Sequence, residues 1–101
     1  MSNHKLNQKF VEWDDLRDHL ALLFRARDIN RSEKMKQGIE LLEFIIMNEK
    51  DASPVNFLER FNFIKNNTHN YSAFRQLDEL FKETKKKIAR LRVQNTKKEN
   101  E

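Results

Sequence analysis

The stretch Ser53-Pro-Val-Asn-Phe-Leu-Glu-Arg-Phe-Asn-Phe-Ile64 has the clearest helix start and the densest run of large apolar side chains in the chain. Ser53 is a residue type favoured at helix N-caps, and Pro54 suits the first helical position, where its missing N–H costs nothing. One stripe of this helix carries the apolar residues Phe57, Leu58, Phe61 and Ile64. Two further apolar residues, Val55 and Phe63, project from other sides of the helix. We therefore expect this segment to be the central helix of a small helical domain.

This central-helix prediction specifies contacts. Three of its side chains should be buried against apolar residues of the other helices, namely Phe57, Phe61 and Ile64 against Leu16, Leu20, Leu42, Ile46, Leu77 and Phe81. Glu59 and Arg60 are adjacent charges that point about 100° apart, so they cannot pair well with each other. We expect Glu59 to pair with Arg25 or Arg27, and Arg60 to pair with an acid such as Glu79. The alternative is that both charges point to water.

The composition excludes several classes of protein. The 101 residues include one glycine, one proline and no cysteine, which leaves little turn chemistry for a β-sandwich and none for a disulfide scaffold or a cysteine-bound metal. No run approaches the roughly 20 apolar residues of a membrane span. The sequence also lacks a glycine-rich phosphate loop, a cysteine nucleophile and a recognisable metal-binding motif. We therefore expect a cytoplasmic protein with no catalytic residue, no cofactor and no metal.

Helical periodicity continues on both sides of the opening stretch. Apolar spacing predicts a first helix over residues 14–28 and a second over residues 31–48, where Asn30 and Glu33 resemble a capping box. The last helix is expected to begin near Asn70 or Ser72 and to continue to about Val93. Its apolar seam alternates spacings of three and four residues: Phe74, Leu77, Phe81, Thr84, Ile88 and Leu91. Short connections between four helices predict an all-α, up-and-down antiparallel four-helix bundle.

The two ends of the chain differ from this pattern. Residues 1–9 are polar, and residues 94–101 contain no large apolar side chain. Segments of this kind cannot bury enough apolar surface to offset the entropy of ordering. We expect one bundle domain over residues 10–93, flanked by a disordered N-terminal segment and a disordered charged tail.

Two residues of the expected core are candidates for a structural or interaction role beside Glu59 and Arg60. Gly38, the only glycine, lies inside the second helix at a cost of roughly 1 kcal/mol relative to alanine. Close approach of a neighbouring helix would explain it, and a hinge or a binding notch is the alternative. Trp13, the only tryptophan, opens the apolar pattern of the first helix.

The excess of positive charge in this protein of net charge +4 lies in its second half, where the last helix is rich in basic residues. The candidates for contact with a partner or with phosphates are Lys85, Lys86, Lys87, Arg90 and Arg92. The three consecutive lysines fan around the helix, and no aromatic residue interleaves with them as in single-strand binders. Alternatively, the basic residues complement Asp14, Asp15 and Asp18 within the fold, which is the outcome that we favour.

Five segments together resemble the YpoC-like family of small proteins from low-GC Gram-positive bacteria. They are Phe10-Val-Glu-Trp13, Leu23-Phe-Arg-Ala-Arg27, Met35-Lys-Gln-Gly-Ile39, Pro54-Val-Asn-Phe-Leu-Glu-Arg-Phe61 and Tyr71-Ser-Ala-Phe-Arg-Gln-Leu-Asp-Glu-Leu-Phe81. The resemblance covers about residues 10–90. It implies a cytoplasmic bacterial protein and carries no activity with it.

These observations favour one function over another. We expect a non-enzymatic protein–protein interaction or regulatory module, monomeric or homodimeric, whose protein partner the sequence does not name. The alternative is a DNA- or RNA-associated accessory protein that binds phosphates through its basic last helix. Salt dependence separates the two, because phosphate binding weakens steeply with salt and an apolar contact does not.

Overall fold

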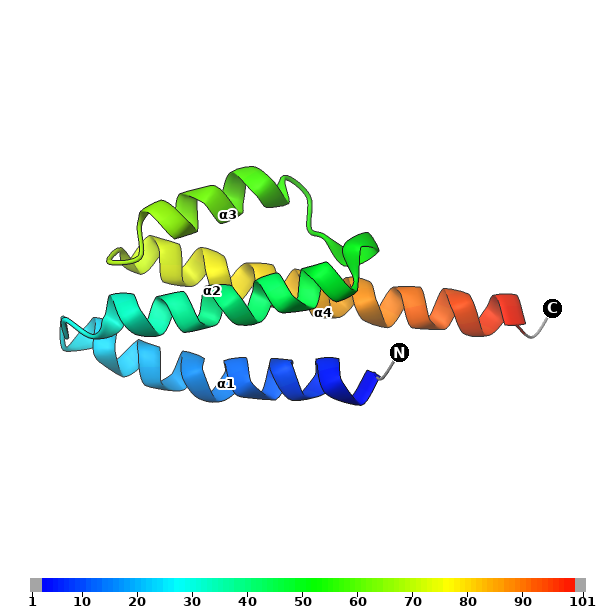
Figure 1. The fold of residues 1–101 in the computed structure, drawn as a ribbon, viewed down its shortest axis with the longest axis horizontal. Coiled ribbons are helices and arrows are strands. Elements are labelled where there is room, and N and C mark those ends of the chain that lie inside the picture. The colour runs from blue at the N-terminus through cyan, green and yellow to red at the C-terminus, as the bar shows by residue number, and fades with distance from the viewer. Residues whose placement is uncertain (1–2, 100–101) are drawn as a thin grey trace.

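The computed structural model describes residues 3–99 of the chain, and the side chains of residues 5–94. The elements are α1 (Asn3–Arg25), α2 (Arg31–Asn48), the short 3-10 helix η1 (Lys50–Ala52), α3 (Phe57–Asn66) and α4 (Tyr71–Glu99). Successive α-helices run in opposite directions, and the described part of the chain contains no strand (Figure 1). The four helices therefore form the predicted up-and-down bundle, with extents of 53 × 25 × 17 Å.

The first helix begins at Asn3, well before the predicted position 14. Leu6, Phe10 and Trp13 are spaced by four and three residues and are all buried, so this polar segment carries a complete core-facing stripe. Residues 3–9 are thus helical where we expected disorder. At the other end, α4 continues through residues 94–99, also expected to be disordered. Residues 1–2 and 100–101 of the two expected disordered segments lie outside the described residues.

The connection between α1 and α2 uses a helix ending that normally favours glycine. The N–H of Asp28 donates to the Leu23 carbonyl over 2.9 Å, and the N–H of Arg27 donates to the Phe24 carbonyl over 3.2 Å, which is a Schellman motif. Arg27 occupies the left-handed position of this motif, with φ 52°. Asn30 is the N-cap residue of α2, as predicted, but its side chain makes no capping hydrogen bond, so the capping box is not formed.

The third helix begins at Phe57 and not at Pro54. Ser53 has φ −59° and ψ 129°, an extended conformation that is favoured for a residue before proline. The N-cap position is taken by Asn56, whose backbone is left-handed at φ 56° and whose carbonyl accepts the N–H of Arg60 over 3.1 Å. The helix therefore starts later than predicted, because the left-handed backbone at Asn56 interrupts the helix that Ser53 and Pro54 would have begun.

The central helix of the bundle is α4, because it contacts α1, α2, η1 and α3. Its predicted seam faces the core, with five residues buried and the last one half-buried: Phe74, Leu77, Phe81, Thr84 and Ile88, then Leu91. The prediction of a central α3 is wrong. Phe61 and Ile64 are buried as expected, but Phe57 is half-buried and Leu58 is 75% exposed. A ten-residue helix that packs mainly on one neighbour buries one narrow stripe.

Candidate interaction surfaces

Trp13 and Gly38 form a close junction between α1 and α2. A Cβ at Gly38 would lie 2.6 Å from Cζ3 of Trp13, so the indole ring fills the space beside the glycine. The ring also stacks on Phe81, with centroids 4.3 Å apart and planes 6° apart. The predicted close approach at Gly38 is confirmed, and the side chain that causes it leaves no binding notch there.

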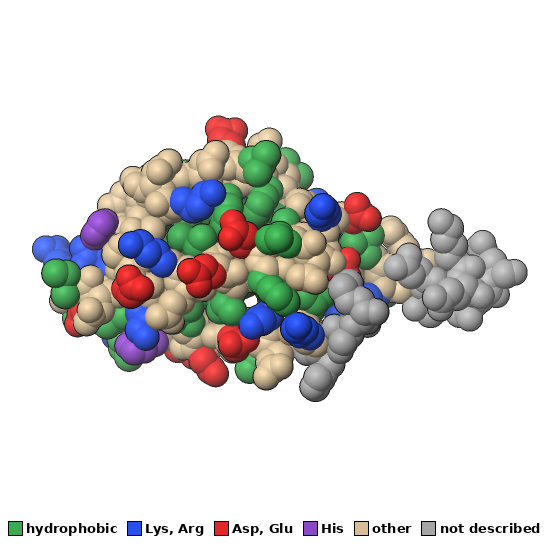
Figure 2. Space-filling view, in the orientation of Figure 1, with side chains coloured by type: hydrophobic (Ala, Val, Ile, Leu, Met, Phe, Trp, Pro, Cys, Tyr) green, Lys and Arg blue, Asp and Glu red, His purple; other side chains and the backbone are tan. Residues whose placement is uncertain are grey.

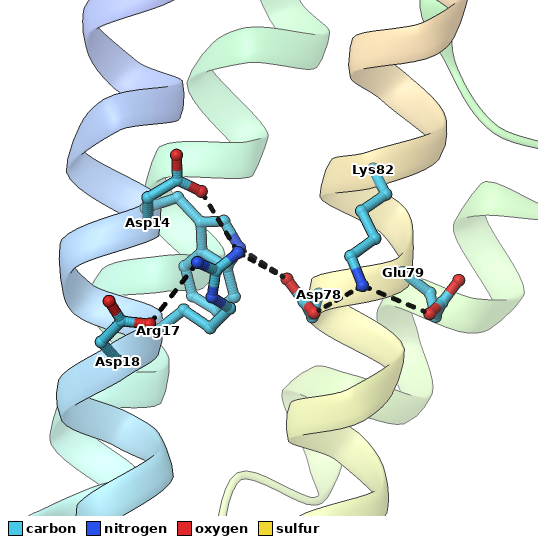
Figure 3. Close-up of polar contacts among 7 residues, drawn as sticks. Asp14, Arg17, Asp18, Asp78, Glu79 and Lys82 are labelled. Carbon is cyan, nitrogen blue, oxygen red and sulfur yellow. Dashed lines mark hydrogen bonds and ion pairs between the residues drawn. The ribbon is translucent and has the colours of Figure 1, made fainter.

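A polar network around Asp78 closes over this junction (Figure 3). Nε1 of Trp13 donates a hydrogen bond to Oδ1 of Asp78 over 3.1 Å. The same carboxylate lies 3.7 Å from Nη1 of Arg17, so Trp13 and Arg17 both tie α1 to α4, and it lies 3.2 Å from Nζ of Lys82 on its own helix. Arg17 also pairs with two acids of its own helix, Asp14 and Asp18, at 3.3 and 3.4 Å.

These pairs contradict the expectation that the basic residues of α4 complement the acids of α1. Because α1 begins at Asn3, Asp14 and Asp18 lie near the middle of the helix and not at its start. They pair with Arg17, which in turn faces Asp78 in the first half of α4 and not its basic C-terminal half. Asp15 is exposed and makes no ion pair within the described residues. The basic residues of α4 must therefore be considered one at a time.

The five basic candidates of α4 differ in their surroundings. Lys87 is half-buried and donates from Nζ to the Ser53 carbonyl over 2.7 Å, so it holds the extended Ser53–Pro54 segment against α4. Lys85 lies over the Phe10 ring, 5.9 Å from its centroid, and Arg92 is half-buried. Lys86 and Arg90 are exposed, and neither makes an ion pair with any residue that the structure describes.

Arg60 and Glu83 form the shortest ion pair among the described residues. Nη1 and Nη2 of Arg60 lie 3.0 and 2.6 Å from the two carboxylate oxygens, a bidentate geometry. Nε of Arg60 donates to Gln76, and Nη1 donates also to the Val55 carbonyl. The hydrogen-bonded guanidinium lowers the pKa of Glu83, and the carboxylate raises the pKa of Arg60. Arg60 is therefore structural, and its partner lies one turn beyond the predicted Glu79.

Glu59 follows the alternative in which the charge points to water. It is exposed, and it makes no ion pair within residues 5–94. The expected partners Arg25 and Arg27 lie at the C-terminal end of α1, whereas Glu59 lies in the first turn of α3. In an antiparallel bundle those positions are at opposite ends, so the prediction of a pair is wrong.

The outer side of α3 carries an apolar surface that the sequence analysis missed. Leu58 and Val55 are 75% and 68% exposed, and Met47 of α2 is exposed as well. A groove of about 650 Å³, which we call the α3 groove, is lined by Ile46, Lys50, Ser53, Asn56, Phe57, Leu58 and Glu59. Figure 2 shows hydrophobic side chains gathered on the α3 side of this face. The signal was present in the sequence, because the helix has apolar residues on more sides than one neighbour can cover.

Two kinds of site have no counterpart in the described part of the chain. No helix there is long and apolar enough to cross a membrane. Nor do the described residues bring together three or more histidine, cysteine or acidic side chains in an arrangement that could hold a metal ion.

The structure and the comparisons define the class of protein and its family. The class is a small all-α protein with a four-helix up-and-down bundle and an exposed apolar groove beside its third helix. The chain belongs to the YpoC-like protein family, whose family model matches residues 3–96. No match was found among curated proteins, and none among solved structures.

Proposed function

We propose that this protein is a non-enzymatic interaction module of the cytoplasm that binds a protein partner through the α3 groove. The observation that carries the proposal is the 75% exposure of Leu58, which lines an open, mainly apolar groove together with Ile46 and Phe57. Single exposed apolar residues are ordinary on a protein surface, but a contiguous group beside a groove is typical of an interaction site. The partner should supply an apolar anchor, such as one face of an amphipathic helix.

The rigidity of the groove supports this proposal. Phe57 is held by stacking on Phe61, with ring centroids 4.9 Å apart. Nη1 of Arg60 donates to the Val55 carbonyl, and Nζ of Lys87 donates to the Ser53 carbonyl, so the segment that leads into α3 is held at two points. A preformed groove loses less conformational entropy on binding than a flexible one, which favours affinity.

The test compares two exposed leucines. The full chain is used as bait in native cytoplasm, with captured proteins identified by mass spectrometry, as the wild type, as Leu58→Glu and as Leu22→Glu. Leu22 is 59% exposed on α1 and lies outside the groove, so it is the matched control. We expect a partner that is captured by the wild type and by Leu22→Glu but not by Leu58→Glu, and whose capture persists in high salt because the contact is apolar. Equal capture by all three baits would refute the assignment of the groove.

A second candidate function is phosphate binding by α4, favoured by the exposure of Lys86 and Arg90 without ion pairs among the described residues. Binding to duplex DNA would then weaken as salt increases. Lys86→Gln with Arg90→Gln would lower the slope of this dependence by roughly 1.8, at about 0.9 for each phosphate that is no longer neutralised. Lys36→Gln is the control, since Lys36 is exposed on α2. Wild-type binding that does not change with salt would exclude this candidate.

A further inference from the structure

A second groove lies between α1 and α2 and involves no residue of the α3 groove. It has a volume of about 520 Å³ and is lined by Lys9, Glu12, Asp15, Leu16, Gln37, Glu40, Leu41 and Phe44. Leu16, Leu41 and Phe44 are half-buried and pack against the core, so they form an apolar floor. Nζ of Lys5 and Nζ of Lys9 lie over the Phe44 ring, 5.6 and 5.1 Å from its centroid. We call this surface the α1–α2 groove.

The rim of the α1–α2 groove is acidic, in contrast to the net charge of +4 of the whole chain. Its lining holds three carboxylates and one lysine, and Lys9 already pairs with Glu12 at 3.4 Å. Asp15 and Glu40 are exposed and make no ion pair with the residues that the structure describes. The groove therefore combines an apolar floor with two uncompensated negative charges.

The C-terminal part of α4 has the complementary surface. Figure 1 shows this part of the helix extending beyond the ends of α1 and α2. Ala89 and Val93, four residues apart, form a shallow apolar strip on it, and Val93 is 56% exposed. Lys86 and Arg90 lie beside this strip, both exposed. A protruding helix with an apolar strip and adjacent cations matches a groove with an apolar floor and carboxylate walls.

We propose that the protruding part of α4 of one copy docks into the α1–α2 groove of a second copy. Ala89 and Val93 then cover Leu16, Leu41 and Phe44, while Lys86 and Arg90 face Asp15 and Glu40. The two surfaces belong to different parts of the same chain, so the contact is head-to-tail and its first product is a dimer with one protruding helix and one groove still free. The contact uses other residues than the α3 groove, so the proposed docking does not depend on the proposed function.

Sedimentation velocity of the full chain tests the charge complementarity. We expect the weight-average mass to rise above 12.3 kDa with increasing concentration at low salt and to return toward that value in about 1 M salt. We call the protruding part of α4 the tip. The tip variant combines Lys86→Glu with Arg90→Glu, and the groove variant combines Asp15→Lys with Glu40→Lys. Each variant alone should remain monomeric. Circular dichroism checks that both stay helical, as expected for exposed positions.

An equimolar mixture of the two variants gives the decisive result. The groove variant keeps a normal tip and the tip variant keeps a normal groove, while the two altered surfaces are also complementary in charge. The mixture should therefore associate although neither variant does so alone. A wild type that stays monomeric at every concentration, or one whose association survives both pairs of substitutions, overturns the proposal. So does binding of duplex DNA through Lys86 and Arg90 by a protein that remains monomeric.

The absence of cysteine from the chain allows a second, independent readout. Val93→Cys in one chain and Gln37→Cys in another should form a mixed disulfide under mild oxidation, since Gln37 lines the groove. The control pair is Val93→Cys with Leu22→Cys, which is exposed but lies outside the groove. Preferential cross-linking of the groove pair supports the docking. Equal cross-linking of both pairs, or none of either, contradicts it.

Discussion

Replacing Gly38 with alanine should destabilise the protein, although alanine is the better helix former. The added Cβ would lie 2.6 and 3.2 Å from two carbons of the Trp13 ring and 3.1 Å from Cδ2 of Leu77. Favourable carbon contacts lie at about 3.5–4.0 Å, so the ring would have to retreat by roughly 1 Å. It cannot do so freely, because it stacks on Phe81 and donates a hydrogen bond to Asp78.

The size of this effect follows from two opposing contributions. Helix propensity favours alanine over glycine by about 1 kcal/mol. Overpacking costs about 1–3 kcal/mol, and the upper end applies here because the neighbour is a rigid ring already stacked on Phe81. We expect a net loss of about 2 kcal/mol in the free energy of unfolding, the difference between these two contributions. Urea denaturation followed by circular dichroism at about 222 nm, where the signal reports helix content, measures it.

The Trp13→Leu background supplies the control for this prediction. Without the indole ring only Cδ2 of Leu77, at 3.1 Å, crowds the added Cβ, so Gly38→Ala should there stabilise the protein by up to about 1 kcal/mol, the helix-propensity gain. The sign of the substitution thus reverses with the identity of residue 13. If Gly38→Ala stabilises the wild-type background as well, the close approach of Trp13 to α2 does not determine the glycine, and the reasoning fails.

Other substitutions test the remaining contacts. Arg27→Gly should raise stability by about 0.5–1 kcal/mol in thermal denaturation, because glycine accepts the left-handed backbone at φ 52° without strain, and Arg27→Ala should give no such gain. Phe61→Ala should cost about 3–5 kcal/mol as a buried aromatic truncation, and a loss below about 1 kcal/mol would contradict the packing of α3 on α4. Glu59→Gln should change the unfolding free energy by less than about 0.5 kcal/mol, as expected for an exposed position. Glu83→Gln should lower stability more at about pH 7 than at about pH 3: a depressed carboxyl pKa stabilises the fold above the unfolded value of about 4.3, and this stabilisation is lost as the pH falls through the folded pKa. Urea midpoints that differ equally at both pH values would show that the charge of Glu83 is not the cause.

The fold class could be predicted from the sequence because long periodic segments report on burial directly. The bounds of α2 agree with the predicted range of residues 31–48, and the seam of α4 faces the core from Phe74 to Leu91. The start of α1 was missed because only three apolar residues carry it among polar neighbours. The start of α3 was misplaced because the Ser53–Pro54 pair fits a helix start, whereas the left-handed backbone at Asn56 delays the helix to Phe57.

The candidate surfaces were harder to predict, because they depend on how the helices are positioned along one another. Arg60 was expected to need a partner on another element, but only the fold shows that Glu83 stands opposite it. Likewise, the position of Asp14 beside Arg17 and Asp78 follows from an α1 that begins at Asn3, well before the predicted start. Periodicity identifies which side of a helix is buried. It does not show which residues of a neighbouring helix lie at the same height.

The central place of α4 has a consequence for the order in which the protein folds. α1 and α2 are joined by a short connection and contact each other, so they can form a helical hairpin from local interactions alone. That hairpin still exposes the faces that α4 covers, and the Trp13–Asp78 hydrogen bond joins residues 65 positions apart. During synthesis the core therefore closes only after α4 has been made, as the fourth helix in the chain. Until then the nascent chain presents an apolar face to chaperones and to other chains, and a product truncated before α4 would keep that face exposed.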